Sequence, residues 1–250
     1  MSHSEGCCKG EASAETGCCK GGSKTAEGCC GGNSGGCGCT PAQSFQPMTA
    51  DELAALPTLQ LISRFRRGIE AFDRRLFELT EEQIDMAFLP DAGVGRWPVR
   101  VLLGHVADAD LAAIHRMRRA VAEDNPVFSE WDENAFIDAN LYGNAHEGYA
   151  DSAEADHARV MNALGGPMAS IHTLRQWAGQ WLLTLSDAQM ERTGMHPTRG
   201  PQSVRSILAL YTWHLEHHAS FLTRKLDRML GENQPEAAQN GGCGSGCGCH

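Results

Sequence analysis

One stretch of the sequence, residues 203–230, constrains the fold more than any other. Its apolar side chains recur at the three- and four-residue spacing of one helix face, and they are Val204, Ile207, Leu208, Tyr211, Leu215, Phe221, Leu222 and Leu226. Ser203 is a favourable N-cap residue, and Gly231 suits the position that follows the last helical turn. The sequence therefore predicts one long amphipathic helix between these two residues.

Two histidines within this predicted helix are spaced so that both could bind one metal ion. His214 and His218 are four residues apart, so their imidazoles project from the same face, one turn apart. This spacing allows two ring nitrogens to reach one metal ion, as in helix-borne zinc sites. By itself the pair is equally compatible with two buried histidines that hydrogen-bond to their neighbours, since the chain contains 11 histidines.

The centre of the chain predicts further helices. Helical periodicity runs through residues 49–79, expected to form one helix or a pair, then through 97–122 and 152–185, where Gly165-Gly166-Pro167 could break the helix. No segment shows the sustained period-two alternation of a strand. Four long amphipathic helices, with a longer connection over residues 127–150 between the second and the third, predict an all-α four-helix bundle.

All eleven cysteines lie outside this central region. Eight precede residue 40 and three follow residue 242, and they are Cys7, Cys8, Cys18, Cys19, Cys29, Cys30, Cys37, Cys39, Cys243, Cys247 and Cys249. A disulfide-stapled fold would spread its cysteines through its core, so the cysteine-free centre is expected to bury a core of its own. The sequence thus predicts a Cys/Gly-rich tail over residues 1–47, a helical bundle over 48–231, and a linker with a second Cys-rich tail over 232–250.

The two cysteine-rich tails suggest a separate property. Gly-Cys-Cys units recur eleven residues apart, at Cys7, Cys18 and Cys29, with few apolar residues other than cysteine and alanine between them. We expect such segments to be disordered without metal, because they cannot offset the entropy of ordering. Cysteines separated by glycine suit soft metals such as Cu(I), Zn(II), arsenic or mercury, so every tail cysteine is a candidate ligand. The alternative is a thiol-rich tail without a defined site.

The rest of the composition argues against several classes of protein. The N-terminus lacks the apolar segment of a signal peptide, and no apolar run approaches the roughly 20 residues of a membrane-spanning helix. The formal net charge of −10 argues against a general nucleic-acid-binding protein. We therefore expect a cytoplasmic protein with neither a membrane nor a nucleic acid as its partner.

Two motifs in the helical region resemble the DinB superfamily. They are LGHVAD at residues 103–108 and YTWHLEHH at residues 211–218, and the likeness is closer to the bacillithiol-transferase-like (YfiT-type) branch. Residues 124–128, with Trp131-Asp132-Glu133 after them, also resemble that branch, and the likeness covers residues 50–230. The resemblance implies a four-helix bundle that holds a divalent ion, zinc or nickel, on His105, His214 and His218.

The resemblance also implies an activity. Three neutral imidazoles leave an ion with an open coordination position, which is typical of catalytic sites. A thiol in that position becomes a thiolate nucleophile, and a water becomes acidic enough to attack a carbonyl or similar centre. The implied function is a thiol S-transferase or hydrolase-like enzyme, with a small-molecule thiol or electrophile as its partner. The alternative is a metal or metalloid sequestration or delivery protein with the bundle as its scaffold. The oligomeric state is left open, a homodimer included.

Three residues near the motifs have weaker interpretations. Asp108 and Glu216 are candidates for carboxylates that hold an imidazole in one tautomer, although surface charge is the favoured interpretation of Glu216. His217 points about 100° away from His218 on an ideal helix, so we expect it outside the set of metal ligands.

Overall fold

The structure is a computed structural model of the chain, and it describes residues 48–143 and 152–231. All of these residues belong to one compact unit, Ser44–His250. Both cysteine-rich tails lie outside the described residues, so the disorder and the metal binding expected of them remain predictions.

Short helical pieces and a hairpin accompany the long helices. In chain order the elements are α1 (Ala50–Ala54), α2 (Thr58–Arg66), the 3-10 turns η1 (Gly68–Ala71) and η2 (Arg74–Glu78), α3 (Glu81–Ile84), the 3-10 turn η3 (Pro90–Ala92), α4 (Val99–Ala122), α5 (Glu133–Asp138), α6 (Ala153–Leu182), α7 (Asp187–Met190), β1 (Thr193–His196), β2 (Gly200–Ser203) and α8 (Val204–Leu230).

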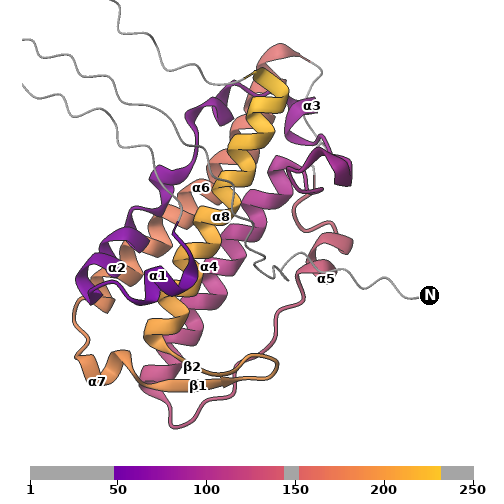
Figure 1. The fold of residues 1–250 in the computed structure, drawn as a ribbon. Helices are drawn as coiled ribbons and strands as arrows, with labels where there is room; N and C mark the ends of the chain where they lie inside the picture. The colour runs from indigo at the N-terminus through magenta and orange to yellow at the C-terminus, as the bar shows by residue number, and fades with distance from the viewer. Residues whose placement is uncertain (1–47, 144–151, 232–250) are drawn as a thin grey trace, which may run out of the picture. The chain divides into compact units, whose positions relative to one another are not determined.

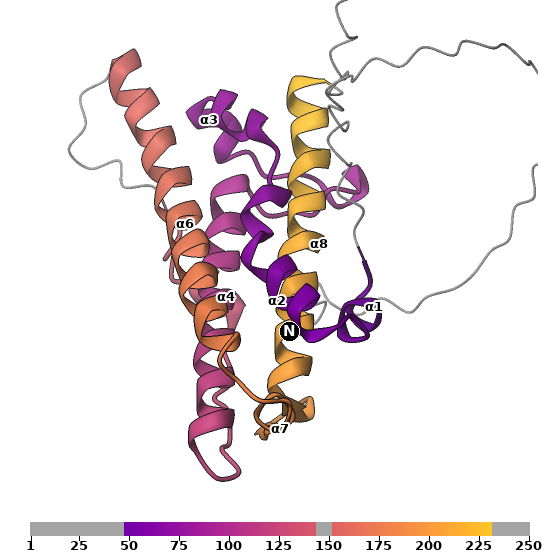
Figure 2. The same cartoon turned by 90° about the vertical axis from the view of Figure 1, so that its left-hand side faces the viewer.

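Three long helices form the body of the bundle in the described residues: α4 with 24 residues, α6 with 30 and α8 with 27. Helix α4 packs against both α6 and α8, and α2 packs against the same two helices. Figure 1 shows α4 and α8 side by side, and Figure 2 places α2 and α4 between α6 and α8. This arrangement confirms the predicted all-α four-helix bundle, with the short α2 in the fourth position.

Both predicted ends of α8 are confirmed. The Ser203 hydroxyl accepts a hydrogen bond from the amide N–H of Ser206 at 3.1 Å. The helix ends at Leu230, directly before Gly231, whose φ of 88° lies in the left-handed region that glycine adopts without strain. The helix thus starts and stops where the capping residues of the sequence predict.

The first predicted helical segment is shorter than expected. Helix α2 ends at Arg66, and the chain continues through η1 and η2, with extended backbone at Phe72 and Leu79. Gly68, a poor helix former, occupies the first break. A Cβ at this position would lie 2.6 Å from the Arg175 guanidinium, so the missing side chain lets the backbone pass it closely. Phe72 and Leu79 are buried although the backbone at both residues is extended. Their apolar spacing therefore resembles that of a helix without forming one.

The third predicted helix is not broken at residues 165–167. Helix α6 continues without interruption, with Pro167 in its interior. A proline there removes one helical hydrogen bond and costs about 3 kcal/mol. Leu164 and Ile171, on either side of the proline, are both fully buried against the bundle core, and this burial offsets the cost.

A two-stranded hairpin precedes α8, whereas the sequence predicts no strand. β1 and β2 pair antiparallel, and Ser203 at the end of β2 is also the N-cap of α8. The amide N–H of Phe128 donates to the carbonyl of Met195 at 2.8 Å, which ties the connection after α4 to the hairpin. Strands of four residues that contain glycine and proline carry too little period-two pattern to be recognised in the sequence.

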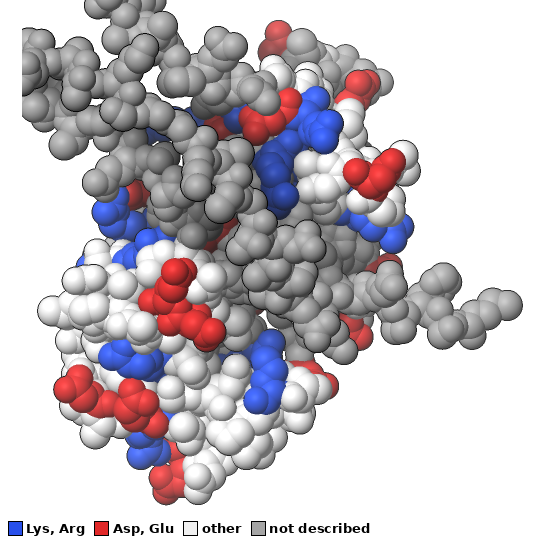
Figure 3. Space-filling view, viewed as in Figure 1, with Lys and Arg blue, Asp and Glu red and all other residues white. Residues whose placement is uncertain are grey.

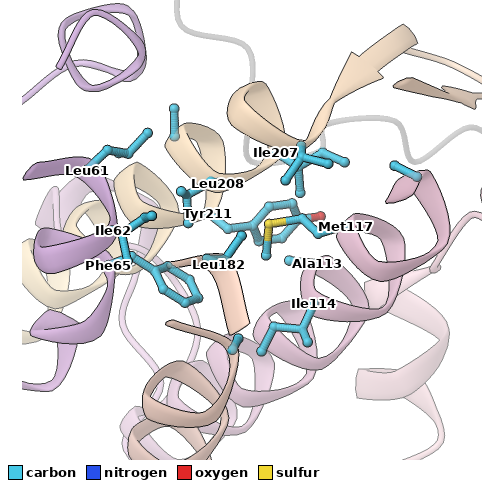
Figure 4. Close-up of a cluster of buried hydrophobic side chains, with 14 of the residues drawn as sticks. Leu61, Ile62, Phe65, Ala113, Ile114, Met117, Leu182, Ile207, Leu208 and Tyr211 are labelled. Atoms are coloured by element: carbon cyan, nitrogen blue, oxygen red, sulfur yellow. The ribbon is translucent and has the colours of Figure 1, made fainter. Parts of the chain in front are cut away.

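Two clusters of buried apolar side chains hold the helices together. Figure 4 shows the first cluster, to which α2, α4, α6 and α8 contribute Phe65, Met117, Leu182 and Leu208, each at most 1% exposed. The second cluster joins the other halves of α4, α6 and α8, and Leu103 is one of its fully buried members. Buried apolar surface of this kind is the dominant favourable term in folding.

The two clusters meet near the middle of α4 and α8. Helix α4 contributes residues up to Val106 to the second cluster and residues from Ala109 onward to the first. Helix α8 contributes residues up to Tyr211 to the first cluster and residues from Leu215 onward to the second. The short stretches between these positions, residues 107–108 and 212–214, therefore lie at the junction of the two cores.

Charged side chains of both signs share the surface. Figure 3 shows acidic and basic side chains lying next to one another on the face in view, with uncharged surface between them. The pair Arg67–Glu70, at 2.6 Å, is one exposed ion pair of this kind. Within residues 48–143 and 152–231, no helix has the length and the apolar character needed to cross a membrane.

Candidate metal centre

Three imidazole rings from two helices meet at the junction of the two core clusters. His105 comes from α4, while His214 and His218 come from consecutive turns of α8. The Nε2 atom of His214 lies 3.1 Å from Nε2 of His105 and 3.1 Å from Nε2 of His218. The nitrogens that the three rings could offer to an ion all lie within 4.8 Å of one another. The structure thus brings together the three histidines that the family resemblance singles out.

These distances suit a shared cation better than a hydrogen-bonded group. A zinc–nitrogen bond is about 2.0–2.1 Å long, which places two nitrogens of a tetrahedral ion about 3.3 Å apart. A neutral imidazole carries only one N–H, so Nε2 of His214 can form a hydrogen bond with only one of its two close neighbours. A cation instead accepts the lone pairs of all three rings, so the residues present fit a divalent ion.

Two of the ring nitrogens in the cluster have no hydrogen-bond partner among the described residues. They are Nδ1 of His105 and Nδ1 of His218, and both are buried. The two side chains are deeply enclosed, since His105 is 2% exposed and His218 is 6% exposed. A ring that binds an ion through Nε2 carries its proton on Nδ1, so these atoms are where a partner would fix the tautomer.

Burial keeps the three imidazoles neutral. It lowers the pKa of His105 to about 4, and together with the neighbouring His105 and His217 it lowers the pKa of His218 to about 3. The pKa of His214 is held well below its usual value by burial and then by its neighbours His218 and His105. Neutral rings present free lone pairs at neutral pH, which is the state that metal ligation requires.

Aromatic rings surround the histidines. The ring centroid of Trp97 lies 4.8 Å from that of His105, and Trp131 stacks on the same imidazole at 5.2 Å with 21° between the planes. The ring of Tyr211 lies 5.7 Å from that of His214. Rings at these distances restrict the rotation of the imidazoles and keep water away, which strengthens electrostatic interactions at the site.

The two carboxylates that the sequence offers as partners of an imidazole have other partners. Asp108 accepts a hydrogen bond from the Tyr142 hydroxyl at 2.7 Å. Glu216 accepts hydrogen bonds from Nε of Arg64 at 2.6 Å and from Nη2 at 2.9 Å. The favoured interpretation of Glu216 as surface charge is wrong, because the residue is 2% exposed and the packing of α2 on α8 covers it.

A third carboxylate, which sequence reasoning missed, lies beside the cluster. Oε2 of Glu133, the first residue of α5, is 4.0 Å from Nδ1 of His105. Burial, followed by the neighbouring carboxylate of Asp132, raises the pKa of Glu133. Its signal in the sequence is the run Trp131-Asp132-Glu133, which belongs to the family resemblance but has no metal-ligand spacing.

His217 lies outside the three-histidine cluster. Its ring stacks on Trp213 at 4.8 Å with 22° between the planes, and it meets the edge of Phe221 at 4.8 Å. Its ring also meets the edge of the His218 imidazole at 5.6 Å, so His217 borders the cluster without belonging to the three candidate ligands. The eleven tail cysteines lie outside the described residues, so their role as ligands stays a prediction.

A cavity of about 420 Å³ lies along α4 next to the cluster, within the range that small-molecule sites occupy. Its lining includes the apolar side chains of Leu111 and Phe136, the guanidinium-bearing Arg116, and Trp131. The indole of Trp131 therefore borders the cavity and also stacks on His105. Its Nε1 is buried without a hydrogen-bond partner among the described residues.

Gly104, directly before His105, makes room for Tyr142. A Cβ at this position would lie 2.3 Å from the tyrosine ring. We expect Gly104→Ala to lower the thermal unfolding midpoint of the metal-free protein, because the displaced ring outweighs the gain of about 1 kcal/mol in helix propensity. Thermal unfolding followed by circular dichroism measures the effect.

The matched control for this change is Gly165→Ala in α6. A Cβ there would meet nothing within 4 Å, so only the propensity gain of up to about 1 kcal/mol applies and the midpoint should rise. A Gly104→Ala protein as stable as the Gly165→Ala protein would contradict the packing of Tyr142 against α4.

Comparisons with known proteins point to one family. The sequence profile of the DinB superfamily matches residues 64–222. A protein of Oceanobacillus iheyensis named "putative metal-dependent hydrolase" is 29% identical over 167 residues, which cover 65% of this chain and 84% of that protein. YfiT of Bacillus subtilis has the same description and is 29% identical over 157 residues, covering 61% of this chain and 74% of YfiT. A relative from Bacillus mycoides is 27% identical over 177 residues, covering 69% of this chain and 89% of the relative.

A solved structure is also similar to this chain. The structure of YfiT from Bacillus subtilis, whose title describes "an unusual four-helix bundle topology", is 22% identical and has a TM-score of 0.47. The match covers 76% of this chain and 93% of YfiT.

Proposed function

This chain belongs to the DinB superfamily, and we propose that it is a metal-dependent enzyme whose divalent ion is held by His105, His214 and His218. The observation that carries the proposal is the convergence of three Nε2 atoms from α4 and α8 at separations that one ion can bridge. The relatives named as metal-dependent hydrolases support it. Zinc or nickel is the ion that we propose, since both suit imidazole ligands.

The reaction that we propose is thiol S-transfer or hydrolysis on a small molecule. A divalent ion with an open position supplies Lewis acidity, which lowers the pKa of a thiol or a water that reaches it. The three histidines orient that ion, while Trp97, Trp131 and the other rings around them exclude bulk water. In S-transfer a sulfur–carbon bond forms to the electrophile while its leaving group departs with the electron pair.

The cavity beside the cluster supports a small molecule as the substrate. Its volume of about 420 Å³ fits such a ligand, and its lining combines apolar side chains with charged ones of both signs, Asp108, Glu130, Arg116 and Arg119. We therefore propose that an electrophile with an apolar body and a polar end occupies the cavity. Trp131, which lines the cavity and stacks on His105, would then contact both this substrate and one of the proposed ligands.

Removal of the metal tests this function. Residues 40–242 contain no cysteine, so alkylation with iodoacetamide blocks the tail thiols of the full-length protein and leaves the bundle untouched. We expect the alkylated protein to lose turnover of a low-molecular-weight thiol with a halogenated aromatic acceptor, or of an activated ester, after chelation and dialysis. Addition of Zn(II) or Ni(II) should restore the rate. Turnover that survives complete removal of metal would contradict the proposal.

A second function is favoured by the placement of the cysteines. All eleven lie in the two tails, where a catalytic bundle does not need them. We propose that the tails bind a soft metal or metalloid for sequestration or delivery, with the bundle as scaffold. Titration with Cu(I) or As(III) before and after alkylation tests this, and an unchanged stoichiometry would reject it. The two functions are compatible, because the tails could load the site in the bundle.

A further inference from the structure

We infer that Glu133 is a positioning residue of the metal centre, which holds the Nδ1–H of His105 and so fixes the tautomer and the direction of that ring. The inference rests on the proposed function, because it concerns one of the three proposed ligands. It assigns the contact to a residue of the connection between α4 and α6, whereas the sequence places the candidate carboxylates on α4 and α8.

The first observation that supports this role is a missing hydrogen-bond partner at His105. Nδ1 of this ring is buried and has no hydrogen-bond partner among the described residues. Coordination through Nε2 requires the proton to sit on Nδ1, which makes this atom a buried donor. Oε2 of Glu133 faces it at 4.0 Å, which is close enough for attraction but longer than a hydrogen bond. Rotation of the glutamate side chain, or one bridging water, spans the remaining gap.

The second support is the way in which the chain holds Glu133 in place. Asp132 caps α5, and its Oδ1 accepts hydrogen bonds from the amide N–H groups of Asn134 at 3.0 Å and Ala135 at 3.1 Å. Trp131, two residues before the glutamate, stacks on the imidazole of His105. Two side chains of one short segment thus contact the same ring, one on its face and one at its Nδ1 edge.

The third support is that the other nearby carboxylates have partners of their own. The hydrogen bond from Tyr142 holds Asp108, and the two hydrogen bonds from Arg64 hold Glu216. The side chain of Glu133 is 35% exposed, so it can turn toward the ring without disturbing the core. Carboxylates in this position typically raise the basicity of a ligating histidine and orient it.

The test compares Glu133→Ala, Glu133→Gln and the control Asp138→Asn, a change of an exposed carboxylate at the other end of α5. Full-length, alkylated, metal-free protein is titrated with Zn(II) against a chromophoric chelator, and Co(II) is used to record the visible ligand-field spectrum. We expect Glu133→Ala to weaken Zn(II) binding about 10–100-fold and to shift the Co(II) bands. Glu133→Gln keeps a hydrogen-bond acceptor, so it should weaken Zn(II) binding less. Asp138→Asn should bind Zn(II) as the unaltered protein does.

The outcomes separate this inference from the proposed function. Unaltered affinity and an unaltered Co(II) spectrum in Glu133→Ala would overturn the role of Glu133 while leaving the three-histidine site intact. An equal loss in Asp138→Asn would overturn it too, because the effect would then belong to α5 as a whole. If the alkylated, unaltered protein takes up no ion, the proposed function and the inference fail together. Thermal unfolding of the metal-free variants should match that of the unaltered protein, which shows that a lost affinity is not a lost fold.

Discussion

Replacement of His214 by alanine is expected to abolish the binding of a divalent ion by the bundle. Nε2 of His214 is the central atom of the cluster, 3.1 Å from the nitrogens of both other rings. Two imidazoles without the third leave an ion with too few protein ligands for a catalytic three-histidine site. Elemental analysis of full-length, alkylated protein after dialysis against Zn(II) should fall from about one ion per chain to none. Turnover should fall to background in the same preparation.

His217→Ala is the matched control for this change. His217 is also a partly buried histidine of α8, but its ring packs on Trp213 and Phe221 and meets only the edge of His218, and it is not one of the three candidate ligands. We expect this variant to bind one ion per chain as before. If both variants keep their zinc, the cluster is not the binding site. If both lose it, the loss reflects damage to α8 and not removal of a ligand.

Loss of the Asp110 carboxylate is expected to produce the largest fall in stability. Asp110 and Arg175 form a buried ion pair between α4 and α6, with bonds of 2.6 Å to Nε and 2.7 Å to Nη2. Arg175 is fully buried, and its guanidinium also donates to the carbonyls of Phe65 and Tyr211. Asp110→Ala leaves this charge in the core without a counter-charge. Breaking a buried ion pair in this way typically lowers the free energy of unfolding by about 3–5 kcal/mol. Urea unfolding of the metal-free protein measures the change.

Two further variants test whether the buried charge is the cause. Glu70→Ala removes the partner of Arg67 in an exposed pair, and it should leave the unfolding midpoint nearly unchanged. The double variant Asp110→Ala with Arg175→Met removes the stranded charge and should recover much of the lost stability. A cost of Asp110→Ala no greater than that of Glu70→Ala would contradict the buried ion pair.

The local features of the fold could be predicted from the sequence. The caps of α8 follow from the residue types of Ser203 and Gly231, and the shared face of His214 and His218 follows from their spacing alone. That His105 joins them depends on the packing of α4 against α8, which local pattern does not contain. The family resemblance supplied that pairing, because LGHVAD and YTWHLEHH occur together in one chain.

The features that escaped the sequence depend on tertiary contacts. The break after α2 follows from the passage of the backbone at Gly68 beside Arg175, which lies far along the chain. The unbroken α6 reflects burial on both sides of Pro167, which overrides a local helix breaker. Glu133 approaches His105 only because the connection after α4 folds back over that helix, so neither residue predicts the other.

The hairpin before α8 determines the rotational phase of the whole helix. Ser203 ends β2 and caps α8, and β1 is bonded to the connection after α4, so the first turn of α8 is anchored at a defined angle. Each residue of a helix advances that angle by about 100°. One residue inserted between the hairpin and the histidines would therefore present Trp213 and His217 where His214 and His218 now face α4. The hairpin thus determines which pair of α8 side chains meets His105.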